Sequence, residues 1–133
     1  MERLFKKTLI SLNNIFNFIN DYMYLNNVKQ DIGRSVMLAV EEIFTNLVKH
    51  NKKSINDVSI DIIIKDKKLT ITLIDYDVDH FDITEMVEPN SKQSIEDRPT
   101  GGMGLQLVRK TMDKIFYEYE NKNSKITLIK QLD

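Results

Sequence analysis

Residues 98–113 read RPTGGMGLQLVRKTMD, in which glycines stand directly before an apolar pattern of helical spacing. Glycine lets main-chain N–H groups turn toward one point, and the first N–H groups of a helix have no intrahelical partner. Such a loop attracts phosphate. Three of the protein's four glycines lie here, at Gly101, Gly102 and Gly104. We interpret the segment either as a phosphate-binding loop or as a plain turn that starts a helix.

Composition limits the kinds of protein this chain can be. With 133 residues it fits a single domain, spanning 1–133. There are 19 basic and 20 acidic residues, so no basic field favours direct binding to nucleic acid. Cysteine is absent from the sequence, which excludes disulfides, thiolate metal sites and cysteine nucleophiles. No long apolar segment follows the start MERLFKK, so we expect a cytoplasmic protein without a membrane span.

Apolar periodicity predicts the order of helices and strands. An edge strand is expected over 2–8. Three helices are expected, the first with Ser11 as its N-cap, at about 11–26, 29–51 and 102–112. Alternating apolar and polar residues predict two hairpins, with strands at 58–64, 69–75, 115–120 and 125–132. The polar segment 83–100 contains both prolines and is interpreted as a loop that covers a site.

Polar residues gather on one face of the second expected helix, opposite its apolar arc. They are Glu42, Thr45, Asn46 and Lys49. A carboxylate and a carboxamide one turn apart can orient a nucleophile and hold Mg²⁺ through oxygen ligands, which is the chemistry of phosphoryl transfer. The alternative is an ordinary solvated helix face. A metal cluster of Glu41, Glu42 and His50 is not favoured, because the spacing matches no zinc pattern and His80 lies in a distant loop.

Asp75 ends the second expected strand in phase with the core-facing Leu69, Ile71 and Leu73. A carboxylate is therefore predicted to point inward, where burial is costly without a hydrogen-bond donor. Either Asp75 caps the following turn, or it accepts a hydrogen bond from the amino group of a ligand.

Taken together, three motifs resemble those of the histidine-kinase-like ATPase superfamily with the Bergerat fold. They are VEEIFTNLVKH, ID followed by HFDITE, and RPTGGMGLQLVRKTMDKIFYE. Within that superfamily the chain looks like the anti-sigma factor serine-protein kinases of bacterial partner-switching systems, and the likeness covers nearly the whole chain. The resemblance implies an α/β two-layer sandwich, with a mixed, mainly antiparallel sheet and helices on one face.

The resemblance also implies roles for single residues. Glu42 matches the general base for a substrate serine, Asn46 the residue that holds Mg²⁺, and Asp75 the aspartate that recognises the adenine amino group of ATP. The segment 85–100 matches the ATP lid. The other expected nucleotide contacts, from the glycine box and beside these positions, are Gly101, Gly102, Gly104, Thr45, Lys49 and Arg98.

The chain departs from the family pattern after Asp75. Asp77 stands where the family has the glycine of its first glycine box, and the segment from Asp75 to Phe81 is one residue longer. A carboxylate near the nucleotide repels phosphate, unless the loop bulges and places Asp77 outward.

By resemblance, we expect a homodimeric anti-sigma factor and ATP/Mg-dependent serine-protein kinase that binds a sigma factor and phosphorylates a STAS-domain anti-anti-sigma partner. The alternative is an ATP-binding module that sequesters a partner without phosphotransfer, which the altered glycine box favours. A plain ATPase or a histidine-kinase fragment is disfavoured, because no dimerisation helix with a phospho-acceptor histidine precedes the domain.

Overall fold

The computed structural model describes residues 1–50, 56–79 and 102–132. Helices and strands follow the predicted order. They are β1 (Glu2–Phe5), the 3₁₀ turn η1 (Leu9–Ser11), α1 (Leu12–Leu25), α2 (Gln30–His50), β2 (Val58–Lys65), β3 (Lys68–Asp75), α3 (Gly102–Thr111), β4 (Lys114–Glu120) and β5 (Asn123–Gln131).

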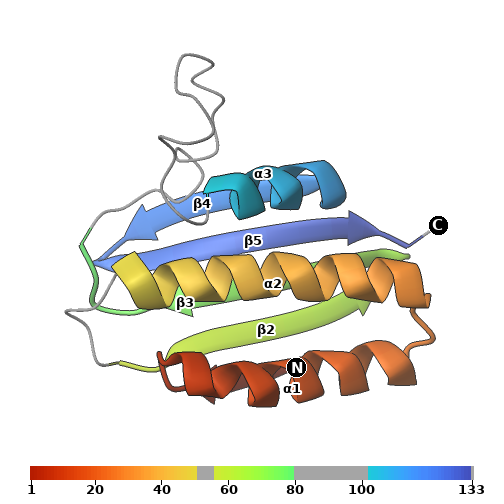
Figure 1. The fold of residues 1–133 in the computed structure, drawn as a ribbon, viewed down its shortest axis with the longest axis horizontal. Helices are drawn as coiled ribbons and strands as arrows, with labels where there is room; N and C mark the ends of the chain where they lie inside the picture. Colours follow the sequence, from red (N-terminus) through yellow and green to blue (C-terminus); the bar gives the residue numbers. More distant parts are fainter. Residues whose placement is uncertain (51–55, 80–101, 133) are drawn as a thin grey trace.

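The described strands form one sheet in the order β1-β2-β3-β5-β4, and each neighbouring pair is antiparallel. Figure 1 shows α1, α2 and α3 side by side over one face of this sheet, with α2 in the middle. The α/β two-layer architecture with helices on one face is therefore confirmed. Among the described residues, none of the helices combines the length and the apolar character that a membrane span requires.

The core lies between the sheet and the helix layer. Alternation along the strands directs Ile60, Leu73 and Ile126, which pair in one cross-strand row, toward the helices, and each is 0% exposed. The middle helix α2 supplies the widest apolar face to this core. Its buried apolar residues are Val36, Ala39, Val40, Ile43, Phe44 and Leu47. Because each larger side chain stabilises the fold by roughly 1.5–3 kcal/mol on burial, α2 is held firmly against the sheet.

One end of the sheet brings distant segments together. β1 ends at Phe5 opposite Val58, the first residue of β2, and Val58 pairs with Asp75, the last residue of β3. Figure 1 shows that the C-terminal end of α2 and the N-terminal end of α3 lie at this same end, on the left. The polar residues predicted on α2, the end of β3 and the start of α3 are thus gathered in one region.

One expectation for the N-terminal region was wrong: β1 stops at Phe5 instead of reaching residue 8. Ser11 is the N-cap residue of α1, as predicted, but its side chain makes no capping hydrogen bond. The Ser11 backbone is itself helical, with φ −68° and ψ −15°, and its hydroxyl donates to the Lys6 carbonyl oxygen at 2.7 Å. Because the chain turns after Phe5, Lys7 leaves the sheet edge and its side chain is only 3% exposed.

Candidate functional site

The second half of α2 carries the four polar residues that the sequence singled out, in different environments. Lys49 is exposed, and Glu42 and Thr45 are half-buried. Asn46 is 1% exposed, although it stands on the helix face opposite the apolar arc. The helix α3 packs against α2. The four residues therefore do not form an ordinary solvated helix face.

Asn46 has one satisfied and one unsatisfied polar atom. Its Nδ2 donates to the Glu42 carbonyl oxygen at 2.6 Å. Its Oδ1 is buried and accepts no hydrogen bond from any residue that the structure describes. Such a buried acceptor costs about 1–3 kcal/mol, and amide oxygen is a ligand type that Mg²⁺ accepts. Asn46 thus fits the metal-holding role that the resemblance implies.

Glu42 lies one turn before Asn46 on α2. Burial raises the pKa of its carboxyl above the ordinary 4.5, the neighbouring Glu41 charge raises it further, and Lys49 lowers it in part. A carboxylate whose pKa moves toward neutrality is better suited to accept a proton from a hydroxyl group. The environment of Glu42 is therefore compatible with a general base.

Asp75 is 0% exposed, in agreement with the inward direction that its strand phase predicted. The amino group that it binds in this structure belongs to the protein, because Lys7 Nζ lies 2.8 Å from Asp75 Oδ1. Sequence reasoning missed Lys7. Nothing in the pattern distinguishes Lys7 from the adjacent Lys6, whose side chain is exposed. Only the turn after Phe5 decides which of the two lysines enters the interior.

The turn after β3 is fixed to the β4–β5 hairpin. The Asp77 N–H donates to Asn123 Oδ1 at 3.3 Å, and the Val78 N–H donates to the Lys122 carbonyl oxygen at 2.8 Å. The Tyr119 hydroxyl donates to the Val78 carbonyl oxygen at 2.7 Å. Asp77 itself is exposed and has φ 55°, in the left-handed region that glycine favours. Of the two alternatives for this loop, the structure therefore has Asp77 facing outward.

The glycine box is described only from its second residue. α3 begins at Gly102 and includes Gly104 in its first turn, at the same end of the sheet as Asp75. The unpaired N–H groups of this first turn suit an anion. Gly101, Arg98, His80 and the expected lid at 85–100 lie outside the described residues. The C-terminal end of α3 is fixed by Lys130, whose Nζ donates to the Thr111 carbonyl oxygen at 2.6 Å.

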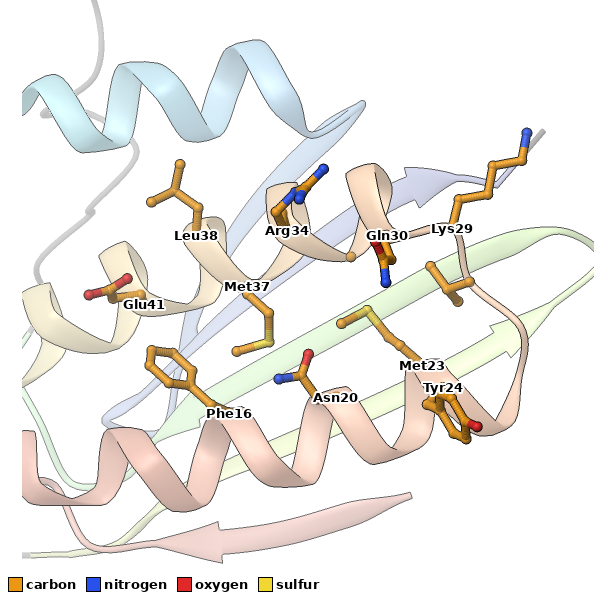
Figure 2. Close-up of a pocket in the computed structure, with 12 residues that line it drawn as sticks. Phe16, Asn20, Met23, Tyr24, Lys29, Gln30, Arg34, Met37, Leu38 and Glu41 are labelled. Carbon is orange, nitrogen blue, oxygen red and sulfur yellow. The ribbon is translucent and has the colours of Figure 1, made fainter.

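A groove of about 700 Å³ lies between α1 and α2, away from the predicted nucleotide residues. Figure 2 shows Phe16 and Met23 from α1 and Met37 from α2 along it. Glu41 lines one end of this groove, whereas the adjacent Glu42 does not line it. Neither Glu42, Asn46 nor Asp75 lines this groove. The adjacent Glu41 is therefore a useful comparison for Glu42.

Solved structures share this fold at low sequence identity. The RsbU and RsbW domains of Rv1364c from Mycobacterium tuberculosis match with TM-score 0.73 and 10% identity, over 99% of this chain and 32% of that one. The SiaB–SiaC complex from Pseudomonas aeruginosa matches with TM-score 0.67 and 9% identity, over 98% and 87%. Acinetobacter baumannii histidine kinase AdeS matches with TM-score 0.58 and 12% identity, over 100% and 68%.

This chain thus spans about a third of the Rv1364c structure, and the likenesses establish a common fold. A search of curated protein sequences finds no match. A protein-family model described as the histidine kinase-like ATPase domain matches residues 5–130, and this description implies ATP binding. Because that match covers nearly the whole chain, the protein belongs to the histidine kinase-like ATPase domain family.

Proposed function

We propose that this chain is an anti-sigma regulatory factor and an ATP- and Mg²⁺-dependent serine-protein kinase. It binds a sigma factor and phosphorylates a STAS-domain anti-anti-sigma partner. The observation that carries the proposal is the buried Oδ1 of Asn46, which accepts no hydrogen bond within the described part of the chain. It lies one turn from Glu42, at the same end of the fold as Asp75 and the start of α3. The anti-sigma role rests on the resemblance of the motifs, and the fold shared with the RsbW domain and with SiaB–SiaC supports it.

In this mechanism each residue has a separate task. Asn46 Oδ1 would hold Mg²⁺, which when bound offsets negative charge on the phosphates. Glu42 accepts the proton of the partner's serine hydroxyl as the serine oxygen bonds to the γ-phosphorus and the bond to the β,γ-bridging oxygen breaks, releasing ADP. The N–H groups at the start of α3 bind phosphate oxygens, and Asp75 accepts a hydrogen bond from the base.

Further contacts belong to the same proposal. Thr45 and Lys49 lie beside Glu42 and Asn46 on α2 and would act as secondary nucleotide contacts. Gly101, Gly102 and Gly104 would meet the phosphates, with Arg98 at the terminal phosphate and 85–100 as the lid. The domain spans 1–133 and acts as a homodimer in the cytoplasm, without direct binding to nucleic acid or membrane.

The second candidate is an ATP-binding module that sequesters its partner without transferring phosphate. Asp77 at the glycine-box position favours it, because a carboxylate there adds negative charge near the phosphates. The outward direction of Asp77 weakens that objection to kinase activity, since an exposed charge is screened by solvent.

The two candidates are separated by incubating the protein with labelled ATP, Mg²⁺ and purified STAS-domain proteins encoded near its gene. A kinase transfers label to a serine of one of them. Glu42→Ala should abolish transfer and retain nucleotide binding. The matched control is Glu41→Ala, which changes the adjacent carboxylate that lines the α1–α2 groove and should retain transfer.

Nucleotide binding without transfer to any of these partners would favour the sequestering module. Transfer that survives Glu42→Ala would show that another group accepts the proton. If the protein binds no nucleotide in the presence of Mg²⁺, both candidates are wrong.

A further inference from the structure

Lys7 and Asp75 form an ion pair inside the protein, 68 residues apart in sequence. The Lys7 side chain is 3% exposed and the Asp75 side chain 0%, and Nζ and Oδ1 lie 2.8 Å apart. Lysine and aspartate are rarely buried this far unless they are paired. Nothing in the proposed mechanism yet uses Lys7, although it contacts the residue expected to read the base.

The two partners of Asp75 would approach it from different sides. β1 lies at one edge of the sheet, two strands from β3, and Lys7 follows β1 directly. α3 lies on the other side of β3, where its last carbonyl is bound by Lys130 of β5. A nucleotide whose phosphates meet the start of α3 therefore reaches Asp75 from the side opposite Lys7.

Energetics argue that Lys7 stays in place when a nucleotide binds. A base offers a neutral amino group, whereas Lys7 offers a full positive charge to a buried carboxylate. Displacing the lysine would separate two opposite buried charges that lie 2.8 Å apart, which costs more than one further hydrogen bond returns. A carboxylate has about four acceptor positions on its two oxygens, so it can bind Lys7 and a base together.

We infer that Lys7 is a positioning residue of the nucleotide site. From the β1 side it compensates the charge of Asp75 and fixes the carboxylate so that its α3 side accepts a hydrogen bond from the 6-amino group of adenine. The inference rests on the proposed nucleotide site and adds to it a determinant of base selectivity. Lys7 touches neither the nucleotide nor the reacting atoms.

The test compares binding of ATP with binding of purine riboside triphosphate, which lacks the 6-amino group, by calorimetry in Mg²⁺. The wild-type protein should prefer ATP on the order of 10-fold, the value of one well-placed hydrogen bond to a charged group. Lys7→Met should reduce this preference to below about 3-fold and leave the affinity for purine riboside triphosphate within about 2-fold. If Lys7 had a purely structural role, Lys7→Met would lower the affinity for both triphosphates equally.

Two further variants complete the design. Lys7→Arg keeps the charge and should keep most of the preference for ATP. Lys6→Met, at the adjacent exposed lysine, should change neither affinity. Thermal unfolding without nucleotide supplies a second measurement. Lys7→Met should be less stable than wild type, and Lys7→Met combined with Asp75→Asn should recover most of the loss, because it removes both charges of the buried pair.

Each outcome decides between the possibilities. A Lys7→Met protein that keeps the wild-type preference for ATP overturns the inference and leaves the nucleotide site intact. A wild-type protein that binds neither triphosphate refutes the proposed function as well. If Lys7→Met does not fold, Lys7→Gln decides: a preference for ATP below about 3-fold supports the inference, and a wild-type preference overturns it.

Discussion

At the scale of single residues, Glu42 and Asn46 lie one turn apart on α2, but one is an ionisable carboxyl group and the other a neutral amide. Both were chosen from the sequence as polar positions of α2. The structure leaves Glu42 half-buried and takes Asn46 out of solvent, with one amide oxygen unpartnered among the described residues. Desolvation therefore acts on a carboxyl group in one case and on a neutral amide in the other. The consequences for stability differ accordingly.

Glu42→Gln is expected to raise the free energy of unfolding at pH 7 and to change it little below pH 4. Burial, then Glu41, raises the pKa of Glu42 above its ordinary 4.5. The protonated form therefore favours folding at pH values below the unfolded pKa, and this contribution is lost as pH rises through the folded pKa. Glutamine carries no charge at either pH. Urea unfolding at both pH values measures the difference, and a variant whose advantage is the same at both would contradict this assignment.

Asn46→Leu is expected to change the free energy of unfolding by no more than about 1 kcal/mol, because it removes a buried acceptor that has no donor among the described residues. The same variant should lose the part of its nucleotide affinity that depends on Mg²⁺. Asn46→Asp keeps an oxygen ligand and should retain that dependence. Titration of a fluorescent ATP analogue with and without Mg²⁺ checks both, and an unchanged Mg²⁺ effect in Asn46→Leu would remove Asn46 from the metal site.

At the scale of elements, the turn after β3 is where the sequence is predicted to depart from the family pattern. It keeps a left-handed backbone at Asp77, where glycine would be unstrained, and it is fixed by hydrogen bonds to the β4–β5 hairpin. A neighbouring element thus supports the left-handed backbone at Asp77. Aspartate tolerates this region better than most residues, at some cost in backbone energy.

Asp77→Gly is expected to stabilise the protein by about 1 kcal/mol, since glycine adopts φ 55° without strain. Asp79→Gly is the matched control, because Asp79 is exposed and is not among the described residues with positive φ. There glycine should lower stability, since it only adds freedom to the unfolded chain. Thermal unfolding of both variants measures the effect. An equal change in the two would show that backbone strain at Asp77 is unimportant.

The same turn allows a comparison of the two aspartates in ATP binding. Asp75→Asn should lower the affinity for ATP far more than Asp77→Asn does, because Asp75 is buried at the end of β3 and Asp77 is exposed. Calorimetric titration of ATP into both variants provides the measurement. Equal losses would mean that the site has been placed on the wrong carboxylate.

At the scale of the whole molecule, the proposed site belongs to no single element. α2, β3, α3 and the segment after β1 meet at one end of the sheet, although they are distant in sequence. A ligand held by several elements binds only the folded chain. Saturating Mg²⁺ and ATP, at a hundred times the dissociation constant, should therefore raise the free energy of unfolding by about 2.7 kcal/mol. Thermal unfolding measures this gain in stability. Chelation of Mg²⁺ should reduce the gain. An unfolding curve that does not change with ATP would contradict the prediction.

By itself, the sequence determined the order of the elements, most of their bounds and the inward direction of Asp75. These features follow from periodicity within one segment, which is local information: Leu69, Ile71, Leu73 and Asp75 share a phase, and all are 0% exposed. The motif resemblance then indicated the family, and residues 5–130 match it.

Only the tertiary structure decided which neighbours those residues have. The turn at Asp77 is bonded to the β4–β5 hairpin, and the pairing of Asp75 with Lys7 depends on a turn after Phe5 that we had predicted as strand. Each is a contact between segments far apart in the chain. Periodicity along one segment carries no information about such partners. The pairing of Lys7 with Asp75 could therefore be identified only from the tertiary structure.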